Sequence, residues 1–284
     1  MNIEKVLAEA IEILKKNSVA SAILDARILM AFSASLSRED IIFKSSQINL
    51  SPSQKEKYFT LIYKRAKKIP LSHLINNREF FANNFYVDEN VLDPRPDSET
   101  LIEMIIDEYK KSTSPINICE IGCGSGCLII SLLKHFKNWN GLAIDISTKA
   151  LAIAQKNAQN NEVIARIDFL ESNLFANLKD NQIFDIIISN PPYIPTGDIE
   201  NLQDEVRLYE PRIALDGGYD GLDFYRKIAI ESKKFLKNKG NIFLEIGFNQ
   251  YLAVKNIFEK ANFKFINYKK DLSGIIRVLE FEKI

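Results

Sequence analysis

The sequence predicts an α/β protein in which a small all-helical domain, residues 1–73, is followed by a β-hairpin linker, residues 74–93, and a larger domain, residues 94–284. In the first 70 residues, apolar side chains recur every three or four positions, as on one face of a helix. From residue 115 onward, short apolar runs alternate with helical patterns. This alternation is typical of a parallel sheet with helices on both faces.

Three helices are expected in the first domain. The first two carry apolar residues on one face, which are Ile3, Val6, Leu7, Ala10, Ile11 and Leu14 in the first and Leu24, Ile28, Leu29 and Phe32 in the second. The third begins at Ser51, a capping residue followed by Pro52 and, three positions after the cap, by Gln54. Pro70 is expected to end this third helix.

The linker is expected to form a short hairpin, because aromatic residues surround Asn83-Asn84, a typical turn sequence. In the larger domain, the same patterns predict a regular succession of elements. Strands are expected at residues 116–121, 141–145, 167–170, 184–189 and 241–246, with helices over residues 98–109, 128–133 and 148–160.

Composition limits the class of protein. Apolar residues make up 46% of the chain and charged residues 26%, which is ordinary for a soluble globular protein. Basic and acidic residues number 37 each, and the lack of a basic excess argues against sequence-specific binding of nucleic acid along an extended site. Residues 1–80 carry 13 basic and 8 acidic residues, which fits either a solvated surface or a docking module for an acidic or RNA-associated partner.

The cysteines and the lengths of the apolar runs indicate the cellular compartment that we expect for the protein. Apolar runs are far shorter than the ~20 residues of a membrane span, and the chain opens on a helical pattern rather than a signal peptide. Cys119, Cys123 and Cys127 fall in a strand, a loop and a helix, so their side chains are expected to diverge. We therefore expect a reduced, cytoplasmic protein with no metal site and no membrane association.

A glycine-rich loop follows the first strand of the larger domain, as Glu120-Ile121-Gly122-Cys123-Gly124-Ser125-Gly126. Glycines let the backbone turn sharply and approach a ligand closely. Asp145 stands 19 residues after Gly126, at the end of the next strand, where a carboxylate can accept hydrogen bonds from both ribose hydroxyls of an adenosine. The spacing resembles the first motif of class I methyltransferases, and a strand-to-helix turn without a ligand is the alternative.

The strand at residues 184–189 ends in Asn190-Pro191-Pro192-Tyr193. Ligands of parallel sheets bind at the carboxyl ends of strands, so this tetrapeptide and Asp145 should face the same crevice. A planar amide or amino nitrogen must be held in line with an electrophilic methyl group, because its lone pair is delocalised. Asn190 and Pro191 offer carbonyl acceptors for its two N–H groups, while Tyr193 offers a flat face. Taken alone, the segment could also be a strand-ending turn.

Beyond these motifs, the chain resembles the HemK family, the protein-(glutamine-N5) methyltransferases of peptide chain release factors. The resemblance runs nearly end to end. It is carried by Pro70-Leu71-Ser72-His73-Leu74, Arg78-Glu79-Phe80, Asp93-Pro94-Arg95-Pro96-Asp97-Ser98-Glu99, the glycine loop, Asn190-Pro191-Pro192-Tyr193-Ile194, Val206-Arg207-Leu208-Tyr209-Glu210-Pro211 and Leu244-Glu245-Ile246-Gly247.

This resemblance implies a class I (Rossmann-like) methyltransferase domain with a mixed seven-stranded sheet behind the helical domain and hairpin. It implies methyl transfer from S-adenosyl-L-methionine, with S-adenosyl-L-homocysteine as product, to N5 of the glutamine in the Gly-Gly-Gln loop of release factors, the proteins of translation termination. The cofactor would contact Glu120, Gly122, Cys123, Gly124, Ser125, Gly126, Asp145, Asn173, Leu174 and Asn190, and the glutamine would be held by Asn190, Pro191, Pro192 and Tyr193. The family often has Asp-Trp where this chain has Asn173-Leu174.

Other interpretations stay open at this point. Asn-Pro-Pro-Tyr is shared with adenine-N6 methyltransferases of DNA and RNA, so methylation of a nucleobase nitrogen is an alternative, although no strongly basic surface accompanies it. A third is a non-catalytic adaptor that binds only cofactor or partner. The charged residues Arg95, Glu99, Arg207 and Glu210 either order the substrate side of the cleft or form surface ion pairs.

Overall fold

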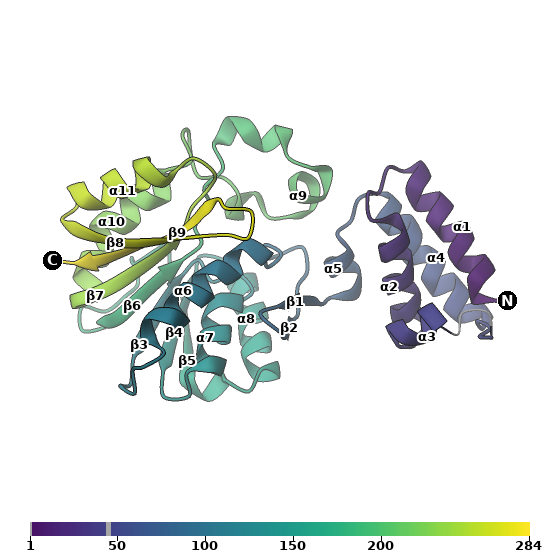
Figure 1. The fold of residues 1–284 in the computed structure, drawn as a ribbon, viewed down its shortest axis with the longest axis horizontal. Helices are drawn as coiled ribbons and strands as arrows, with labels where there is room; N and C mark the ends of the chain where they lie inside the picture. Colours follow the sequence, from purple (N-terminus) through teal and green to yellow (C-terminus); the bar gives the residue numbers. More distant parts are fainter. Residues whose placement is uncertain (1, 44–46) are drawn as a thin grey trace. The chain divides into compact units, whose positions relative to one another are not determined.

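The computed structural model describes residues 2–43 and 47–284 and divides the chain into two compact units (Figure 1). The helical unit comprises Met1–Asn77 and Gln203–Tyr209. The sheet unit comprises Arg78–Leu202 and Glu210–Ile284. The short segment at 203–209 therefore belongs to the helical unit, although its neighbours in the chain on both sides belong to the sheet unit.

The helical unit confirms the three expected helices and adds shorter ones. Its elements are α1 (Ile3–Lys16), α2 (Ala22–Ala34), α3 (Arg38–Phe43), α4 (Pro52–Ala66), α5 (Leu71–Ile75) and, from the returning segment, α9 (Asp204–Tyr209). Ser51 and Gln54 form the expected capping box at the start of α4. The helix ends at Ala66 rather than at Pro70, because the backbone turns into the left-handed region at Lys68, with φ 71°.

The second helix is confirmed, and Leu29 of its predicted apolar face is fully buried, but two of the four residues of that face are exposed. Leu24 is 58% exposed and Phe32 is 40% exposed, whereas Asp25 and Ala26 are buried. The orientation is set by polar partners: Arg65 of α4 forms an ion pair with Asp25 at 2.7 Å, and the Tyr58 hydroxyl donates to the Ala26 carbonyl at 3.1 Å. Arg65 also pairs with Glu205 of α9 at 2.6 Å, within the same unit. The free energy gained by pairing the buried Asp25 carboxylate therefore exceeds the cost of exposing two apolar side chains.

The hairpin is present, but its turn was predicted two residues too late. Strands β1 (Arg78–Phe80) and β2 (Asn83–Phe85) are joined at Phe81-Ala82, both with positive φ, and Asn83 lies inside β2. The Phe81 N–H donates to the Glu99 carboxylate at 2.8 Å, and the Asn83 side-chain amide donates to the Phe81 carbonyl at 2.6 Å. This register buries Phe80 and Phe85 together in the core of the sheet unit, so the hairpin is part of that unit rather than a separate linker.

The sheet unit is a seven-stranded mixed sheet with strand order β5-β4-β3-β6-β7-β9-β8. The strands are β3 (Asn117–Ile121), β4 (Asn140–Asp145), β5 (Ile167–Glu171), β6 (Phe184–Ser189), β7 (Leu236–Glu245), β8 (Phe263–Lys270) and β9 (Ile276–Lys283). Strands β3 to β7 are parallel, and β9 runs antiparallel to both of its neighbours. The predicted fold class is confirmed, including the mixed sheet.

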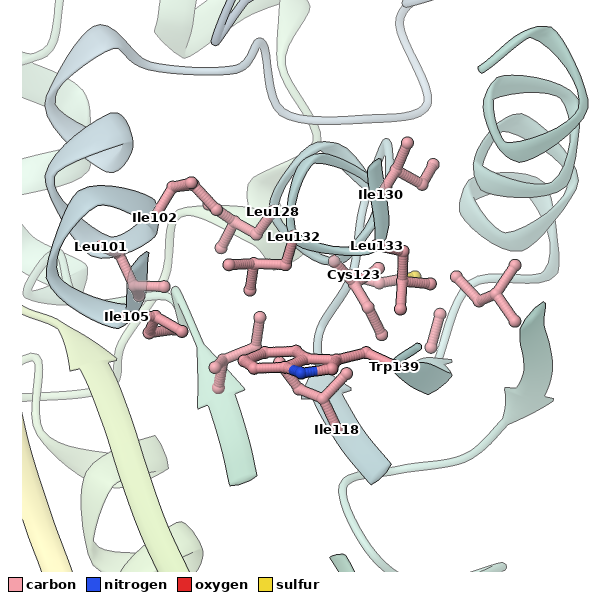
Figure 2. Packing of buried hydrophobic residues seen from close by; sticks show 14 of the residues in the cluster. Leu101, Ile102, Ile105, Ile118, Cys123, Leu128, Ile130, Leu132, Leu133 and Trp139 are labelled. Atoms are coloured by element: carbon pink, nitrogen blue, oxygen red, sulfur yellow. The ribbon is translucent and has the colours of Figure 1, made fainter. Parts of the chain in front are cut away.

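Helices cover both faces of this sheet (Figure 1). Those on one face are α6 (Glu99–Tyr109), α7 (Cys127–His135) and α8 (Thr148–Asn160), and those on the other are α10 (Asp223–Phe235) and α11 (Tyr251–Lys260). The short 3-10 helices are η1 (Pro96–Ser98), η2 (Ile164–Arg166), η3 (Thr196–Asn201) and η4 (Arg212–Ala214). Figure 2 shows this first face, where Leu132 of α7 and Ile118 of β3 lie on opposite sides of the Trp139 ring. This dry packing holds the strand ends at fixed positions.

Candidate functional site

A cavity of about 320 Å³ lies in the sheet unit at the carboxyl ends of β3, β4, β5 and β6. Strand β3 has β4 on one side and β6 on the other, so successive connections leave it in opposite directions. Ligands of open α/β sheets bind at such a switch point, because the loops there separate and leave a crevice. Residues from all four strand ends line the cavity, including Gly122, Asp145, Asn173 and Asn190.

The glycine loop, residues 122–126, turns the chain from β3 into α7. Gly122, Gly124 and Gly126 have φ of 71°, 53° and 77°, in the left-handed region that favours glycine. A Cβ at Gly122 or Gly124 would meet no atom within 4 Å, so these two glycines leave an open cradle, and both line the cavity. A Cβ at Gly126 would come within 2.9 Å of the Ile130 side chain, so this glycine serves close packing.

Asp145, at the end of β4, contacts the glycine loop directly and lines the same cavity. One carboxylate oxygen accepts from the Gly124 N–H at 2.9 Å and the other from the Ser147 N–H at 2.9 Å. Burial raises the pKa of Asp145, while these backbone donors lower it. The same side chain thus ties the loop to β4 and presents acceptor oxygens to the cavity.

Four of the predicted cofactor residues in or beside the loop do not line the cavity. Glu120 is 1% exposed, and its carboxylate accepts from the Ile129 N–H at 3.1 Å, which fixes the first turn of α7. Burial raises the pKa of Glu120 well above its usual value. Ser125 and Cys123 are buried, and Gly126 packs against α7 and α8. These four residues therefore support the glycine loop from its buried side.

The segment after β5 supplies Asn173 and Leu174 to the cavity wall. Leu174 has φ 51°, an uncommon conformation for leucine, and is nearly buried. Ile146, next to Asp145, also lines the cavity and is 47% exposed. We did not predict Ile146 from the sequence, although its position directly after the strand-ending acid is a signal that could have found it.

Asn190, Pro191 and Pro192 line the cavity at the end of β6, as predicted. The strand end is held by Ser189, whose hydroxyl donates to the Ile121 carbonyl of β3 at 2.7 Å. Tyr193 does not line the cavity. Its ring lies against Gly247, and its carbonyl accepts from the Gln250 side chain at 3.0 Å. The role that we expected for Tyr193, a flat face for the substrate, stays a prediction.

The Asn190 side chain has buried polar partners that the sequence did not reveal. Its Nδ2 donates to the Ser98 hydroxyl at 3.2 Å. The carboxyl of Glu245, the last residue of β7, is 1% exposed, and the neighbouring side chains of Ser98 and Asn190 lower its pKa, while burial raises it to about 7. Both residues lie in segments that resemble the HemK family, which was the available signal, but no motif connected them with Asn190.

From the sequence, four charged residues either order the substrate side of the cleft or form surface ion pairs. In the structure they have separate roles. Arg95 contacts both carboxylate oxygens of Glu210, at 2.7 and 2.6 Å, and Glu210 is buried beside the cavity residue Pro211. Burial raises the pKa of Glu210 to about 7, while Arg95 lowers it. Glu99 accepts from the hairpin turn, and Arg207 pairs with its neighbour Asp204 at 2.8 Å, exposed on α9 of the helical unit. The surface interpretation therefore holds for Arg207 but not for Arg95 and Glu210.

Cys119 and Cys123 lie in different core clusters, as the expected divergence requires, but Cys127 packs against the same cluster as Cys123. Within residues 2–43 and 47–284, no group of three or more His, Cys, Asp or Glu side chains is placed to hold a metal ion. No helix over the same residues is both long and apolar enough to cross a membrane.

This arrangement of glycine loop, strand-ending acid and Asn-Pro-Pro segment at adjacent strand ends defines a class I methyltransferase. Residues 95–205 match the family model of the methyltransferase small domain, and residues 5–75 match that of the PrmC N-terminal domain. A methyltransferase from Pyrococcus furiosus shares the fold, with a TM-score of 0.52 at 18% identity over 72% of this chain and 90% of that one.

Similarity over the whole chain identifies one family within this class of methyltransferases. The release factor glutamine methyltransferase of Clostridium botulinum is 35% identical over 100% of both chains. That of Flavobacterium psychrophilum is 42% identical over 89% of this chain and 88% of its own, and that of Agrobacterium fabrum is 36% identical over 95% and 93%. The chain belongs to the family of release factor glutamine methyltransferases, as the resemblance to the HemK family implied.

Proposed function

We propose that this protein methylates N5 of the glutamine in the Gly-Gly-Gln loop of peptide chain release factors, with S-adenosyl-L-methionine as the methyl donor. The observation that carries the proposal is that Asn190, Pro191 and Pro192 line the same cavity as Gly122, Gly124 and Asp145. A planar nitrogen held by the first group would therefore face a cofactor held by the second. Full-length relatives that act on release factors support the choice of substrate.

The residues present suit this cofactor. Gly122 and Gly124 leave space that side chains would otherwise fill, and Asp145 offers carboxylate oxygens suited to ribose hydroxyls. Ile146 and Leu174 add apolar surface to the same cavity, which suits an adenine ring in place of the Trp that the family often carries at Leu174. S-adenosyl-L-methionine supplies an electrophilic methyl group and leaves as S-adenosyl-L-homocysteine.

The protein's own contribution to the chemistry is positioning. An amide nitrogen is a weak nucleophile, so it must be fixed with its lone pair toward the methyl group. Asn190 Oδ1 and the Pro191 carbonyl are acceptors for the two N–H groups of the substrate amide, and the proline pair limits backbone movement between them. The new nitrogen–carbon bond forms as the sulfur–methyl bond breaks, and the N-protonated amide that results is a strong acid, so it releases one N–H proton to water.

The test is to incubate the protein with methyl-labelled S-adenosyl-L-methionine and one of four acceptors: a release factor, its loop variant with Gln→Ala, RNA or DNA. We expect label on the intact release factor and none on the variant. Label on the nucleic acid but not on the factor would favour the nucleobase alternative. Cofactor binding with no transfer to any acceptor would favour the adaptor.

A further inference from the structure

Asn190 can accept a substrate N–H only if its side-chain amide presents Oδ1, and not Nδ2, to the cavity. The two ends of this amide have nearly the same shape, so packing alone does not distinguish them. In the structure the distinction comes from buried partners. Nδ2 donates to Ser98 Oγ at 3.2 Å, and the Glu245 carboxyl lies beside the Asn190 side chain, because Ser189 of β6 is in register with Leu244 of β7. A serine hydroxyl can donate or accept, whereas an ionised carboxyl can only accept, so it is Glu245 that favours Nδ2 rather than Oδ1 on the buried side.

We propose that Glu245 is a positioning residue which, together with Ser98, holds the Asn190 amide with its carbonyl oxygen toward the substrate. This inference rests on the proposed function, in which Asn190 binds the substrate amide. Glu245 does not line the cavity, so it acts through Asn190 rather than on the reacting atoms. Its backbone is fixed as well, because β7 pairs with both β6 and β9 and the Tyr225 hydroxyl donates to the Glu245 carbonyl at 2.9 Å.

Burial makes this arrangement unusual for a glutamate. Glu245 is 1% exposed, and within the described residues its Oε2 has no hydrogen-bond partner. Such a carboxyl is unfavourable for folding, since a buried acceptor without a donor loses its hydration. A purely structural role at this site would be filled better by an apolar residue or a neutral amide. The carboxyl is therefore best explained by what it does to Asn190.

A carboxylate behind the Asn190 amide also changes its electron distribution. The hydrogen bond from Nδ2 to Ser98 and the negative charge of the neighbouring carboxylate draw negative charge toward Oδ1, because the amide is conjugated and is polarised by the groups around it. The substrate nitrogen gains positive charge as the methyl group is transferred, so its N–H groups become stronger donors. A stronger acceptor at Oδ1 then stabilises the transition state more than the bound substrate, which raises kcat rather than lowering KM.

The protonation state of Glu245 is set by its whole surroundings. Burial raises its pKa to about 7, the Ser98 hydrogen bond, Arg277 and the Asn190 hydrogen bond lower it, and Asp97 raises it. The titratable and charged groups that interact with it from the neighbouring elements are Arg277 of β9, Asp97 of η1, Tyr193 after β6, Tyr225 of α10 and Cys127 of α7. Only the ionised carboxyl is purely an acceptor and carries the negative charge that polarises Asn190. We therefore expect kcat to fall as the pH drops through about 7 and the carboxyl is protonated.

The experiment compares Glu245→Gln with wild type in release factor methylation. We expect kcat to fall about ten-fold or more, as for loss of a charge-assisted hydrogen bond, with KM for the factor within about two-fold. The fall in kcat below pH about 7 should disappear, because glutamine does not titrate. Calorimetric binding of S-adenosyl-L-homocysteine should be unchanged, and thermal unfolding should show a folded variant.

Glu280→Gln is the matched control. Glu280 is also buried, its pKa is raised to about 7, and it lies on β9 opposite Phe243, away from the cavity. It should keep the wild-type kcat and pH profile. Ser98→Ala removes the other partner of Asn190 and should lower kcat by roughly three- to ten-fold, which gives a second test if Glu245→Gln does not fold.

Two results would overturn the inference: a wild-type kcat and pH profile in Glu245→Gln, or a loss of cofactor binding in a folded variant, which would show a general structural role. If neither variant folds, the claim that Glu245 and Ser98 act on Asn190 rather than on stability is overturned too. Failure of the proposed function is distinguishable, because it would appear as no methylation of the factor by wild type.

Discussion

The glycine loop and Asn190 face each other across one cavity but are held in place differently. The loop is shaped mainly by its own backbone, with three glycines in the left-handed region, and it is tied down by Asp145, 21 residues from Gly124, and by Asn157, 32 residues from Ser125. Asn190 is held through its side chain by Ser98, 92 residues away, and by the carboxyl at the end of β7. In the function that we propose, cofactor binding therefore depends mainly on local chain geometry, and substrate orientation depends on a network that only the folded sheet assembles.

This difference predicts how cofactor binding and substrate orientation should respond to mutation. Changes in the glycine loop act on the free energy of cofactor binding or of unfolding, because backbone shape is their only contribution. Changes in the Asn190 network act on kcat, because the affected atoms are needed in the transition state rather than for folding. Each prediction below separates these effects.

The largest effect is expected for Asn190→Ala. This change removes the acceptor Oδ1 and leaves Ser98 and Glu245 without their shared partner. We expect kcat to fall by about a hundred-fold or more, the range seen when one preorganised polar group of an active site is deleted. The Kd of S-adenosyl-L-methionine, measured by calorimetry, should stay within a few-fold. Wild-type turnover in this variant would refute the role given to Asn190.

On the opposite side of the cavity, Asp145→Ala should reverse this pattern. It removes the acceptors that we propose for the ribose hydroxyls, and it removes the bond to the Gly124 N–H. We expect the Kd of the cofactor to rise by about ten- to a hundred-fold, as for lost hydrogen bonds to a charged group, while kcat at saturating cofactor changes by only a few-fold. A fall in kcat with an unchanged Kd would contradict the division between the two sides.

Gly126→Ala tests whether the loop is held by backbone geometry. Alanine would need φ 77° and would place its Cβ 2.9 Å from Ile130 Cδ1 and 3.2 Å from Ala154 Cβ. We expect the free energy of unfolding to fall by about 2–3 kcal/mol, from left-handed strain and overpacking together. Gly197→Ala is the control, because a Cβ there meets no atom within 4 Å and φ is not positive, so its stability should match wild type. Equal denaturation midpoints for the two variants would contradict this explanation.

The smallest effect concerns how stability depends on pH through a buried acid that does not line the cavity. Burial raises the pKa of Glu280 to about 7, while its hydrogen bond from Asn241 lowers it. A carboxyl whose folded pKa lies above its unfolded value contributes stability at low pH that is lost as the pH rises through about 7. Glu280→Gln should therefore gain stability relative to wild type at pH about 8.5 compared with pH about 5.5, by about 1–2 kcal/mol. Thermal unfolding at both pH values measures it, and a difference that does not change with pH would exclude this origin.

Much of the fold could be predicted because its signals are short-range. The capping box at Ser51, the apolar face of α1, the alternation of strands and helices, and the helix at Thr148–Asn160 all depend on residues within a few positions of one another. The α2 face and the hairpin turn could not be predicted in the same way. Asp25 is buried because of Arg65, 40 residues away, and the turn at Phe81-Ala82 follows from burying Phe80 beside Phe85.

The same division applies to the site. By itself, the sequence determined that a glycine loop, an acid and an Asn-Pro-Pro segment would meet at the carboxyl ends of neighbouring strands, because backbone geometry and strand order are encoded locally. Only the tertiary structure decided which atoms of these residues face the cavity. Glu120 turns toward α7, Tyr193 packs against Gly247, and Asn190 is turned by Ser98 and Glu245. The orientation of a side chain depends on partners brought together by folding, and sequence spacing does not record them.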